Sequence, residues 1–314
     1  MDRSELTRAV KQLACDVGFT TAGVTRAEPF TEEAARFEAW VESGAHGYMS
    51  YLERSGEKRR DVREILPSAK SILALSLNYY HPEPTPGPPY LKISRYAWGE
   101  DYHDVMRSML DDLMSRIKLL VPDVEGRYYV DTGPIMDKAV AERAGIGWIG
   151  KHTNVITREV GSWVFLAEII LSLDLEPDPP ATDMCGTCDR CIDACPTQAI
   201  TAPYQLDATK CIPYLTIELK PEHEIPDEFD GKLDGWLFGC DICQDVCPWN
   251  RFAKKSSLQA FAPREENNCL TTGAILSMQQ EEFSRRFKNS PIKRTKLAGL
   301  QRNVRALLRN TEKK

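Results

Sequence analysis

The sequence predicts an α/β domain, then a small cysteine-rich domain, and finally a helical, basic C-terminal segment. Three observations support this fold class. Apolar strand-like runs alternate with amphipathic helical patterns up to about residue 175. Eight of the ten cysteines lie between residues 185 and 247, and lysine and arginine dominate after residue 285. We expect the three domains at 1–178, 179–255 and 256–314.

Each element of the first domain has its own signal. Buried or half-buried strands are predicted where β-branched and apolar residues cluster, at 68–80, 126–133 and 161–173. Helices are predicted by an apolar spacing of three and four residues, at 4–17, 31–43, 101–120 and 135–144. The five prolines of 81–90 predict an irregular loop, and a second proline-rich stretch at 175–183 marks the expected domain boundary.

Composition favours a soluble protein with a substantial core. Of the 314 residues, 42% are hydrophobic and 27% charged. The longest apolar stretch is interrupted by Glu168 and Asp174, so no membrane-spanning helix is expected. The N-terminus lacks the basic region and continuous apolar run of a signal peptide, which predicts a cytoplasmic protein. In that compartment, clustered cysteines favour metal or redox sites over disulfides.

The charge is unevenly distributed. Residues 285–314 contain eleven basic residues and one acidic residue, so this segment carries a net charge of +10 within a total of −6. A basic segment on an acidic body predicts contact with a polyanion, most simply nucleic acid. A solvated helical tail explains the charge equally well.

The cysteines form two sets of one motif. C-x2-C-x2-C-x3-C-P begins at Cys185, and a second set begins at Cys211 with an insertion after its first cysteine. In this ferredoxin spacing, the fourth cysteine ligates the other [4Fe–4S] cluster. Crossed ligation therefore predicts one cluster on Cys185, Cys188, Cys191 and Cys247, and the other on Cys195, Cys211, Cys240 and Cys243. Two zinc sites are the alternative, although zinc gives no reason for the motif to occur twice. The remaining Cys15 and Cys269 are expected to be buried small hydrophobes.

Beyond the cysteines, the stretches SRYAWGEDYHDVM (94–106) and VDTGPIMDKAVAERAGIGWIGKHTNVI (130–156) make the chain resemble the epoxyqueuosine reductase family. The resemblance implies a nitroreductase-like, cobalamin-binding first domain and reduction of epoxyqueuosine to queuosine at the tRNA wobble position. It also implies base-off cobalamin without a protein axial ligand, and two [4Fe–4S] clusters that carry electrons to it. The expected partners are tRNA carrying epoxyqueuosine and an external low-potential electron donor. We expect a monomer without a membrane partner.

Asp131 is the candidate catalytic residue. It ends a β-rich run just before Gly133-Pro134, and a carboxyl group there can protonate the oxygen that leaves the epoxide. The resemblance gives the family's proton donor the same position. Alternatively, Asp131 or Thr132 caps the helix expected near Ile135. Asp137 is a rival carboxyl group, which we expect at the surface of that helix.

The resemblance also implies cobalamin contacts, at Arg59, Ser94, Asp131, Val155, Leu166, Cys240 and Asp241. The glycines of GWIGKHTN (147–154) are expected to let the backbone approach a large flat ligand, and Trp148 is expected in the core. Asp101-x-His103 begins a known cobalt-ligand pattern, but Met106 replaces its glycine and the residues start a helix. We therefore expect His103 and Asp101 to contact substrate or a catalytic group rather than cobalt.

For tRNA, the expected phosphate contacts are Lys293, Arg294, Lys296, Arg302 and Arg305. The chain ends on RNVRALLRN, which resembles the first helix of the HEAT-type repeats of longer relatives, so we expect a short form. A reductive dehalogenase-like reductase, a ferredoxin-like electron carrier and a zinc-stapled RNA-binding module are the alternatives. The 180 residues before the cysteines argue against an electron carrier alone.

Overall fold

A four-stranded antiparallel sheet forms the centre of the first domain in the computed structural model, which describes residues 1–83, 91–267 and 269–309. Its strand order is β1-β2-β7-β4, with bounds Thr21–Arg26, Ser71–Asn78, Val164–Leu171 and Gly126–Tyr129. β2 and β7 pair along all eight residues of each. The three predicted strands are confirmed. β1 was not predicted, because TAGVTR is short and has no clear apolar pattern.

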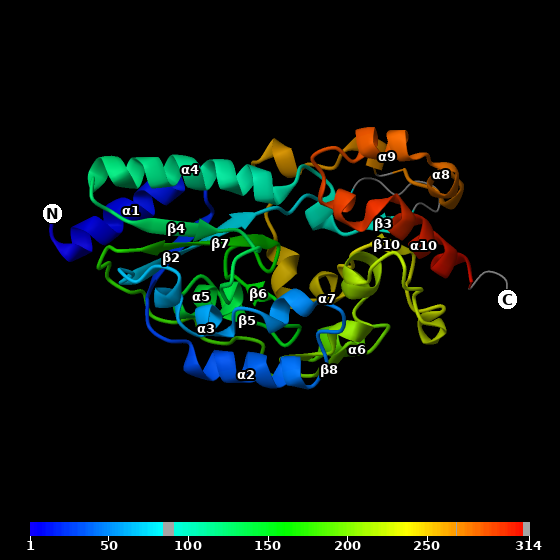
Figure 1. The fold of residues 1–314 in the computed structure, drawn as a ribbon, viewed down its shortest axis with the longest axis horizontal. Helices are drawn as coiled ribbons and strands as arrows, with labels where there is room; N and C mark the ends of the chain where they lie inside the picture. Colours follow the sequence, from blue (N-terminus) through cyan, green and yellow to red (C-terminus); the bar gives the residue numbers. More distant parts are fainter. Residues whose placement is uncertain (84–90, 268, 310–314) are drawn as a thin grey trace.

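Helices cover both faces of this sheet (Figure 1). One face packs against α1 (Arg3–Val17) and α4 (Tyr102–Leu120), and the other packs against α5 (Asp137–Arg143). α2 (Thr31–Glu42) and α3 (Gly56–Arg60) complete the second side. The four helical predictions are confirmed, although α5 begins at Asp137 rather than near Ile135.

Strand alternation divides the core between the two faces. Leu73, Leu75 and Leu77 of β2 join the α1 and α4 core, whereas Ile72 and Ala74 point to α5. β7 follows the same rule, since Ile169 and Leu171 share the first core and Ile170 the second. Glu168 has the parity of Ile170, so this acidic side chain points from the middle of the sheet toward α5.

Short elements lie beside the sheet. One hairpin, β5 (Trp148–Ile149) with β6 (Val155–Ile156), belongs to the first segment, and the other, β8 (Ile200–Ala202) with β9 (Gln205–Leu206), belongs to the cysteine-rich segment. The short helices α6 (Arg190–Asp193) and α7 (Ile242–Asp245) each contain a cysteine of the motifs. The C-terminal segment contains α8 (Thr272–Ser277), α9 (Gln280–Arg286) and α10 (Lys296–Leu308). Single 3-10 turns lie at Ser50–Glu53, Val62–Glu64, Arg95–Ala97, Ala208–Lys210, Asp227–Phe229, Pro248–Phe252, Gln259–Phe261, Glu265–Asn267 and Pro291–Thr295, and a π-helical turn lies at Tyr214–Glu218.

Residues of the three predicted segments pack against one another. β3 (Lys92–Ile93) pairs in parallel with β10 (Trp236–Phe238), and Trp98 packs in one core with Phe283 and Val304 of the C-terminal helices. The proline-rich stretch 175–183 lies along β1, since the Asp178 carboxylate accepts from Val24 N at 2.8 Å. The three segments therefore pack against one another in the folded protein (Figure 1), and the predicted domain boundaries stay a prediction.

The predictions for the two remaining cysteines and for the proline-rich loop have different outcomes. Cys15 and Cys269 are exposed, so their prediction as buried hydrophobes is wrong: Cys15 lies on the solvent side of α1 and Cys269 in a turn. Residues 84–90 of the proline-rich loop lie outside the described residues. Among the residues that are described, no helix is long and apolar enough to cross a membrane.

Candidate active site

The first four predicted ligands line one cavity. Cys185, Cys188 and Cys191 meet Cys247 around a space of about 230 Å³. Cys247 follows α7, Cys191 lies in α6, and Cys185 and Cys188 precede α6, so the packing of these two helices brings the distant thiol to its partners. Trp148 is 1% exposed and packs edge-on against Trp249 beside this cavity, which confirms its core position.

The second four thiols line a different and larger cavity. Cys195, Cys211, Cys240 and Cys243 face a space of about 430 Å³. The structure thus gathers the cysteines in the two groups that crossed ligation requires, although ligation itself stays a prediction. Burial raises the pKa of Cys191 to about 11, and it raises the pKa of Cys211, Cys240 and Cys243 further. Such thiols need bound cations to become thiolates, which suits iron.

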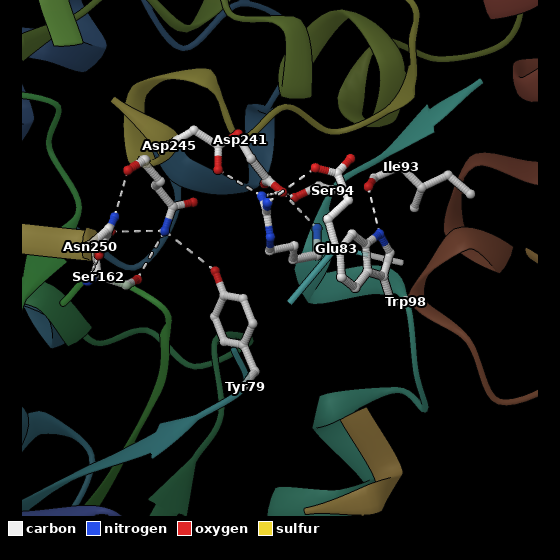
Figure 2. Close-up of polar contacts among 11 residues, drawn as sticks. Tyr79, Glu83, Ile93, Ser94, Trp98, Ser162, Asp241, Asp245 and Asn250 are labelled. Carbon is white, nitrogen blue, oxygen red and sulfur yellow. Dashed lines mark hydrogen bonds and ion pairs between the residues drawn. The ribbon is translucent and has the colours of Figure 1, made fainter. Parts of the chain in front are cut away.

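A buried polar network fixes the second cysteine motif to the sheet. Gln244, between Cys243 and Cys247, donates from Nε2 to the backbone oxygen and Oγ of Ser162 at 2.9 and 3.0 Å. Asn250 donates to the same hydroxyl at 2.8 Å, and Ser162 N donates back to Asn250 Oδ1 at 2.7 Å. Figure 2 shows this network beside Tyr79 at the end of β2. A fully paired network of this kind holds the thiols at a fixed place relative to the larger domain.

Asp241 is a buried residue that holds Ser94 in the lining of the larger cavity. Its side chain is 0% exposed and accepts hydrogen bonds from Ser94 Oγ and from Arg95 N, the latter at 2.8 Å (Figure 2). Burial raises its pKa to about 6 against the opposing effect of these bonds. Ser94 lines the cavity and the Asp241 side chain does not, so Asp241 acts on the cavity through Ser94.

The positions matched to cobalamin contacts separate into two groups. Ser94, Asp131, Leu166 and Cys240 line the larger cavity. Arg59, Val155 and Asp241 are not among the residues that line it, and their contact with cobalamin stays a prediction. Arg59 donates to Ile135 O at 3.0 Å, and Val155 is buried in the core on the α5 side.

The glycines of 147–154 have another purpose than predicted. A Cβ at Gly147 would lie 2.3 Å from Ile156 O, and one at Gly150 would lie 2.5 Å from Ile156 Cδ1. Both glycines are therefore needed for close packing of β5 on β6, and a role in the approach of a ligand stays a prediction. The part of this stretch that does reach the larger cavity is polar and was not predicted: His152, Thr153 and Asn154.

Asp131 lies just beyond β4 with a φ of 56°. Its Oδ2 accepts from Tyr102 OH at 2.7 Å and lies 3.6 Å from His103 Nε2. α5 begins with Met136 as its N-cap, without a side-chain hydrogen bond, so capping by Asp131 or Thr132 is wrong. The strained, left-handed backbone turns this carboxylate toward α4 and into the cavities.

His103 and Asp131 form a charged pair. The His103 imidazolium, whose Nε2 lies 3.6 Å from Asp131 Oδ2, is the largest effect that holds the pKa of Asp131 below its usual value, and Tyr102 lowers this pKa as well, whereas burial raises it. Burial lowers the pKa of His103, but Asp101 and Asp131 outweigh it and raise this pKa to about 9. Near neutral pH the pair consequently carries one proton, and His103 holds it. His103 Nδ1 lies 2.8 Å from Asp101 Oδ1, which fixes the ring.

The prediction that Asp137 is a surface residue is wrong. Its carboxyl lines the larger cavity together with Asp131, and its Oδ1 atom is buried without a hydrogen-bond partner. The reason is that α5 packs against β7, so the first turn of the helix faces the sheet instead of solvent. Glu168, which no motif indicated, points to the same place and is 1% exposed.

A second cavity, of about 330 Å³, lies on the other side of Asp131. Asp131, Tyr102 and His103 line this cavity together with Glu218 and Arg294. Arg294 donates to Glu218 Oε2 at 2.8 Å. Asp131 therefore stands between a cavity that contains four thiols and a cavity that borders the basic C-terminal segment.

The basic residues predicted to contact phosphate differ in exposure. Lys293, Lys296 and Arg305 are exposed, and Arg294 is half exposed at the second cavity. Arg302 is 0% exposed, so its prediction as a phosphate contact is wrong. Its guanidinium donates to the backbone oxygens of Leu215, Leu219, Lys220 and His223 at 2.7–3.1 Å. It joins α10 to the segment that follows Cys211.

Arg302→Ala is expected to lower the free energy of unfolding by about 3 kcal/mol or more, because four carbonyl groups lose their donor and two of these bonds are fully buried. Urea denaturation measures this change, with the exposed Arg305→Ala as the matched control. A stable Arg302→Ala protein that binds RNA more weakly would restore Arg302 as a phosphate contact.

Two four-thiol cavities beside a carboxylate-lined cavity define an iron–sulfur oxidoreductase. Residues 184–250 match the 4Fe-4S double cluster binding domain family, and residues 59–132 match the family described as epoxyqueuosine reductase QueG, DUF1730. The epoxyqueuosine reductase of Leadbetterella byssophila is 49% identical over 300 residues, which are 96% of this chain and 97% of that protein. That of Cellulophaga algicola is 48% identical over 94% and 95% of the two chains. The chain belongs to the epoxyqueuosine reductase family.

Solved structures show the same fold. A crystal structure of epoxyqueuosine reductase with an epoxyqueuosine-modified tRNA-Tyr stem loop superposes with a TM-score of 0.89 at 35% identity, covering 97% of this chain and 81% of that chain. The enzyme from Bacillus subtilis gives 0.88 at 34% identity, with the same coverage. The predicted fold class is confirmed by these matches and by the cluster-domain family.

Proposed function

We propose that this chain reduces epoxyqueuosine in tRNA to queuosine, with Asp131 as the proton donor and with cobalamin in the larger cavity. Family membership at 49% identity over nearly the whole chain supports the reaction. The placement of Asp131 between the two cavities is the observation that carries the site assignment.

The larger cavity suits cobalamin in composition and in its neighbours. Aromatic and aliphatic side chains of Tyr96, Phe165 and Leu166 give it an apolar wall, while the second thiol group lies on the opposite side. When bound, cobalamin supplies a strongly reducing metal centre, and the clusters supply single electrons. We propose base-off binding without a protein axial ligand, which agrees with His103 being held by Asp101 in the other cavity.

Proton delivery falls to Asp131 and His103. Removing the epoxide oxygen leaves an alkene, and the departing oxygen must be protonated. Asp131 is ionised before substrate binds, because His103 holds the proton of the pair. When substrate excludes water from Asp131, the carboxylate becomes less stable, and the proton can pass from His103 through Asp131 to the oxygen. Tyr102 OH donates a hydrogen bond to Asp131 Oδ2 at 2.7 Å and so fixes the orientation of this carboxylate.

We propose the second cavity as the place where the modified nucleotide enters. Lys293, Lys296 and Arg305 lie exposed on the adjacent segment and can contact phosphates, while Arg294 lines the cavity itself. A solved relative holds a tRNA stem loop, and the Bacillus subtilis structure is described with its catalytic aspartate loop swung out of the active site. The first description supports an RNA substrate, and the second supports an aspartate as the catalytic acid. We further propose a cytoplasmic monomer with an external low-potential donor.

Nucleoside mass spectrometry tests the proposal. Epoxyqueuosine-containing tRNA is incubated anaerobically with cluster-reconstituted protein and a strong reductant, with and without cobalamin. Queuosine that forms only with cobalamin supports the substrate, the reaction and the cofactor together. If protein with intact clusters and bound cobalamin forms no queuosine, the proposed function is refuted.

The turnover rate is expected to fall at alkaline pH with an apparent pKa of about 9, because His103 must carry a proton and its pKa is raised to that value. The sign follows from the raised pKa: the proton is present below it and lost above it. Initial rates of queuosine formation between about pH 6 and about pH 10 measure this decline in rate. A His103→Gln variant that retains the same alkaline limb would exclude His103 as the proton reserve.

A further inference from the structure

We propose that Asp137 and Glu168 share a proton in the wall of the larger cavity and supply the second proton that the reaction consumes. The inference rests on the proposed function and goes beyond it by assigning a role to Glu168, which no motif indicated, and to Asp137 as its partner. Two facts support it: the reaction consumes two protons, and two buried carboxyl groups near Asp131 have no role in the proton transfer described above.

The reaction needs two protons. An epoxide becomes an alkene when both of its carbon–oxygen bonds break, and two electrons and two protons convert the departing oxygen to water. The electrons come from the external donor class named above. Asp131 and His103 hold one proton between them near neutral pH. A second proton must therefore reach the departing oxygen within each turnover, and a buried acid near Asp131 can supply it.

Strand parity and helix packing bring the two carboxyl groups together. Glu168 lies in the middle of β7 with Ala74 and Tyr129 as its cross-strand neighbours, and its side chain points toward α5. Asp137 is the first residue of α5, which packs directly on β7. Glu168 Oε2 and Asp137 Oδ1 are both buried without a hydrogen-bond partner among the described residues. Two such oxygens become partners as soon as one carboxyl group is protonated.

The charged groups around the pair leave it protonated. Arg59 and Lys138 are the nearby cations and Asp131 is the nearby anion. Arg59 Nη1 donates to Ile135 O at 3.0 Å, and Lys138 Nζ donates to Thr153 O at 2.8 Å. Burial is the largest effect on both acids: it raises the pKa of Asp137 to about 6 and raises the pKa of Glu168 well above its usual value. The pair therefore retains a proton near neutral pH.

The pair has a route to the reacting groups. Asp137 lines the same cavity as Asp131, and the two carboxyls influence each other electrostatically. Glu168 lies deeper and is 1% exposed, so bulk water does not exchange with it directly. A proton moves from Glu168 to Asp137 and then along the cavity wall to Asp131 after Asp131 has given up its own. Asp137 and Glu168 act through Asp131, so they are positioning residues for the proton.

Infrared spectroscopy of the purified protein, with clusters and cobalamin bound, tests the pair without turnover. At neutral pH we expect a protonated-carboxyl stretching band that Glu168→Gln removes and that the exposed Glu159→Gln retains. Loss of the band should occur as pH rises through the deprotonation of the pair. A wild-type spectrum without this band, or an unchanged band in Glu168→Gln, overturns the proposal.

Kinetics provide the second measurement. Glu168→Gln keeps the size of the side chain but cannot release a proton, so kcat is expected to fall by about 10- to 100-fold with KM unchanged. Glu168→Leu should fold and show the same loss, and Glu168→Asp should recover part of the rate. Unchanged kcat in both Gln and Leu variants also overturns the proposal. If the wild-type protein makes no queuosine, the proposed function has failed, and the infrared band still decides whether the shared proton exists.

Discussion

Asp131→Asn is expected to lower kcat by about two to four orders of magnitude, because the amide cannot transfer a proton to the departing oxygen. The side chain keeps its shape and can still accept the hydrogen bond from Tyr102. Binding of the clusters and cobalamin should therefore be unchanged. Single-turnover formation of queuosine, measured by nucleoside mass spectrometry, gives the size of the effect.

The matched control for this substitution is Asp104→Asn, which lies in the first turn of α4 and is exposed to solvent. It changes charge by the same amount near the same site and should leave turnover unaltered. Absorption spectra of both variants report whether the cofactors remain bound. Full activity of Asp131→Asn with normal spectra would remove Asp131 from the acid role and leave His103 as the direct donor.

Serine substitutions of the cysteines are expected to abolish turnover and, in pairs, to reveal the crossed ligation. Loss of any one ligand should remove roughly four of the eight irons expected per chain. Cys191→Ser with Cys247→Ser should lose no more iron than either substitution alone, because both thiols line the smaller cavity. Cys191→Ser with Cys195→Ser should lose nearly all of it, although these cysteines are close in sequence.

Iron analysis and electron paramagnetic resonance of the reduced proteins distinguish these patterns. Cys15→Ser and Cys269→Ser are the controls, since both cysteines are exposed and away from the two cavities. The reverse result, with Cys191 and Cys195 behaving as one site, would show that each motif binds its own cluster. The two thiol cavities would then have to be reassigned.

Most of the fold and part of the site could be predicted from the sequence. β2 and β7 were predictable because long runs of buried residues leave little choice of structure, while β1 escaped because its six residues lack such a run. The exposed lysines of the C-terminal segment and Arg302 looked alike, since charge alone does not report burial. Only the surrounding backbone oxygens show that Arg302 has a structural task.

The sequence by itself determined the two cysteine motifs, the candidate acid Asp131 and the family, because each depends on residue type and local spacing. The tertiary structure decided which thiols share a cavity, that Asp131 separates two cavities, and that Asp137 faces Glu168 across the α5–β7 contact. These features join residues from distant parts of the chain. The physical reason is that burial and the charges of neighbouring groups set proton affinity, and both arise only when the chain is packed.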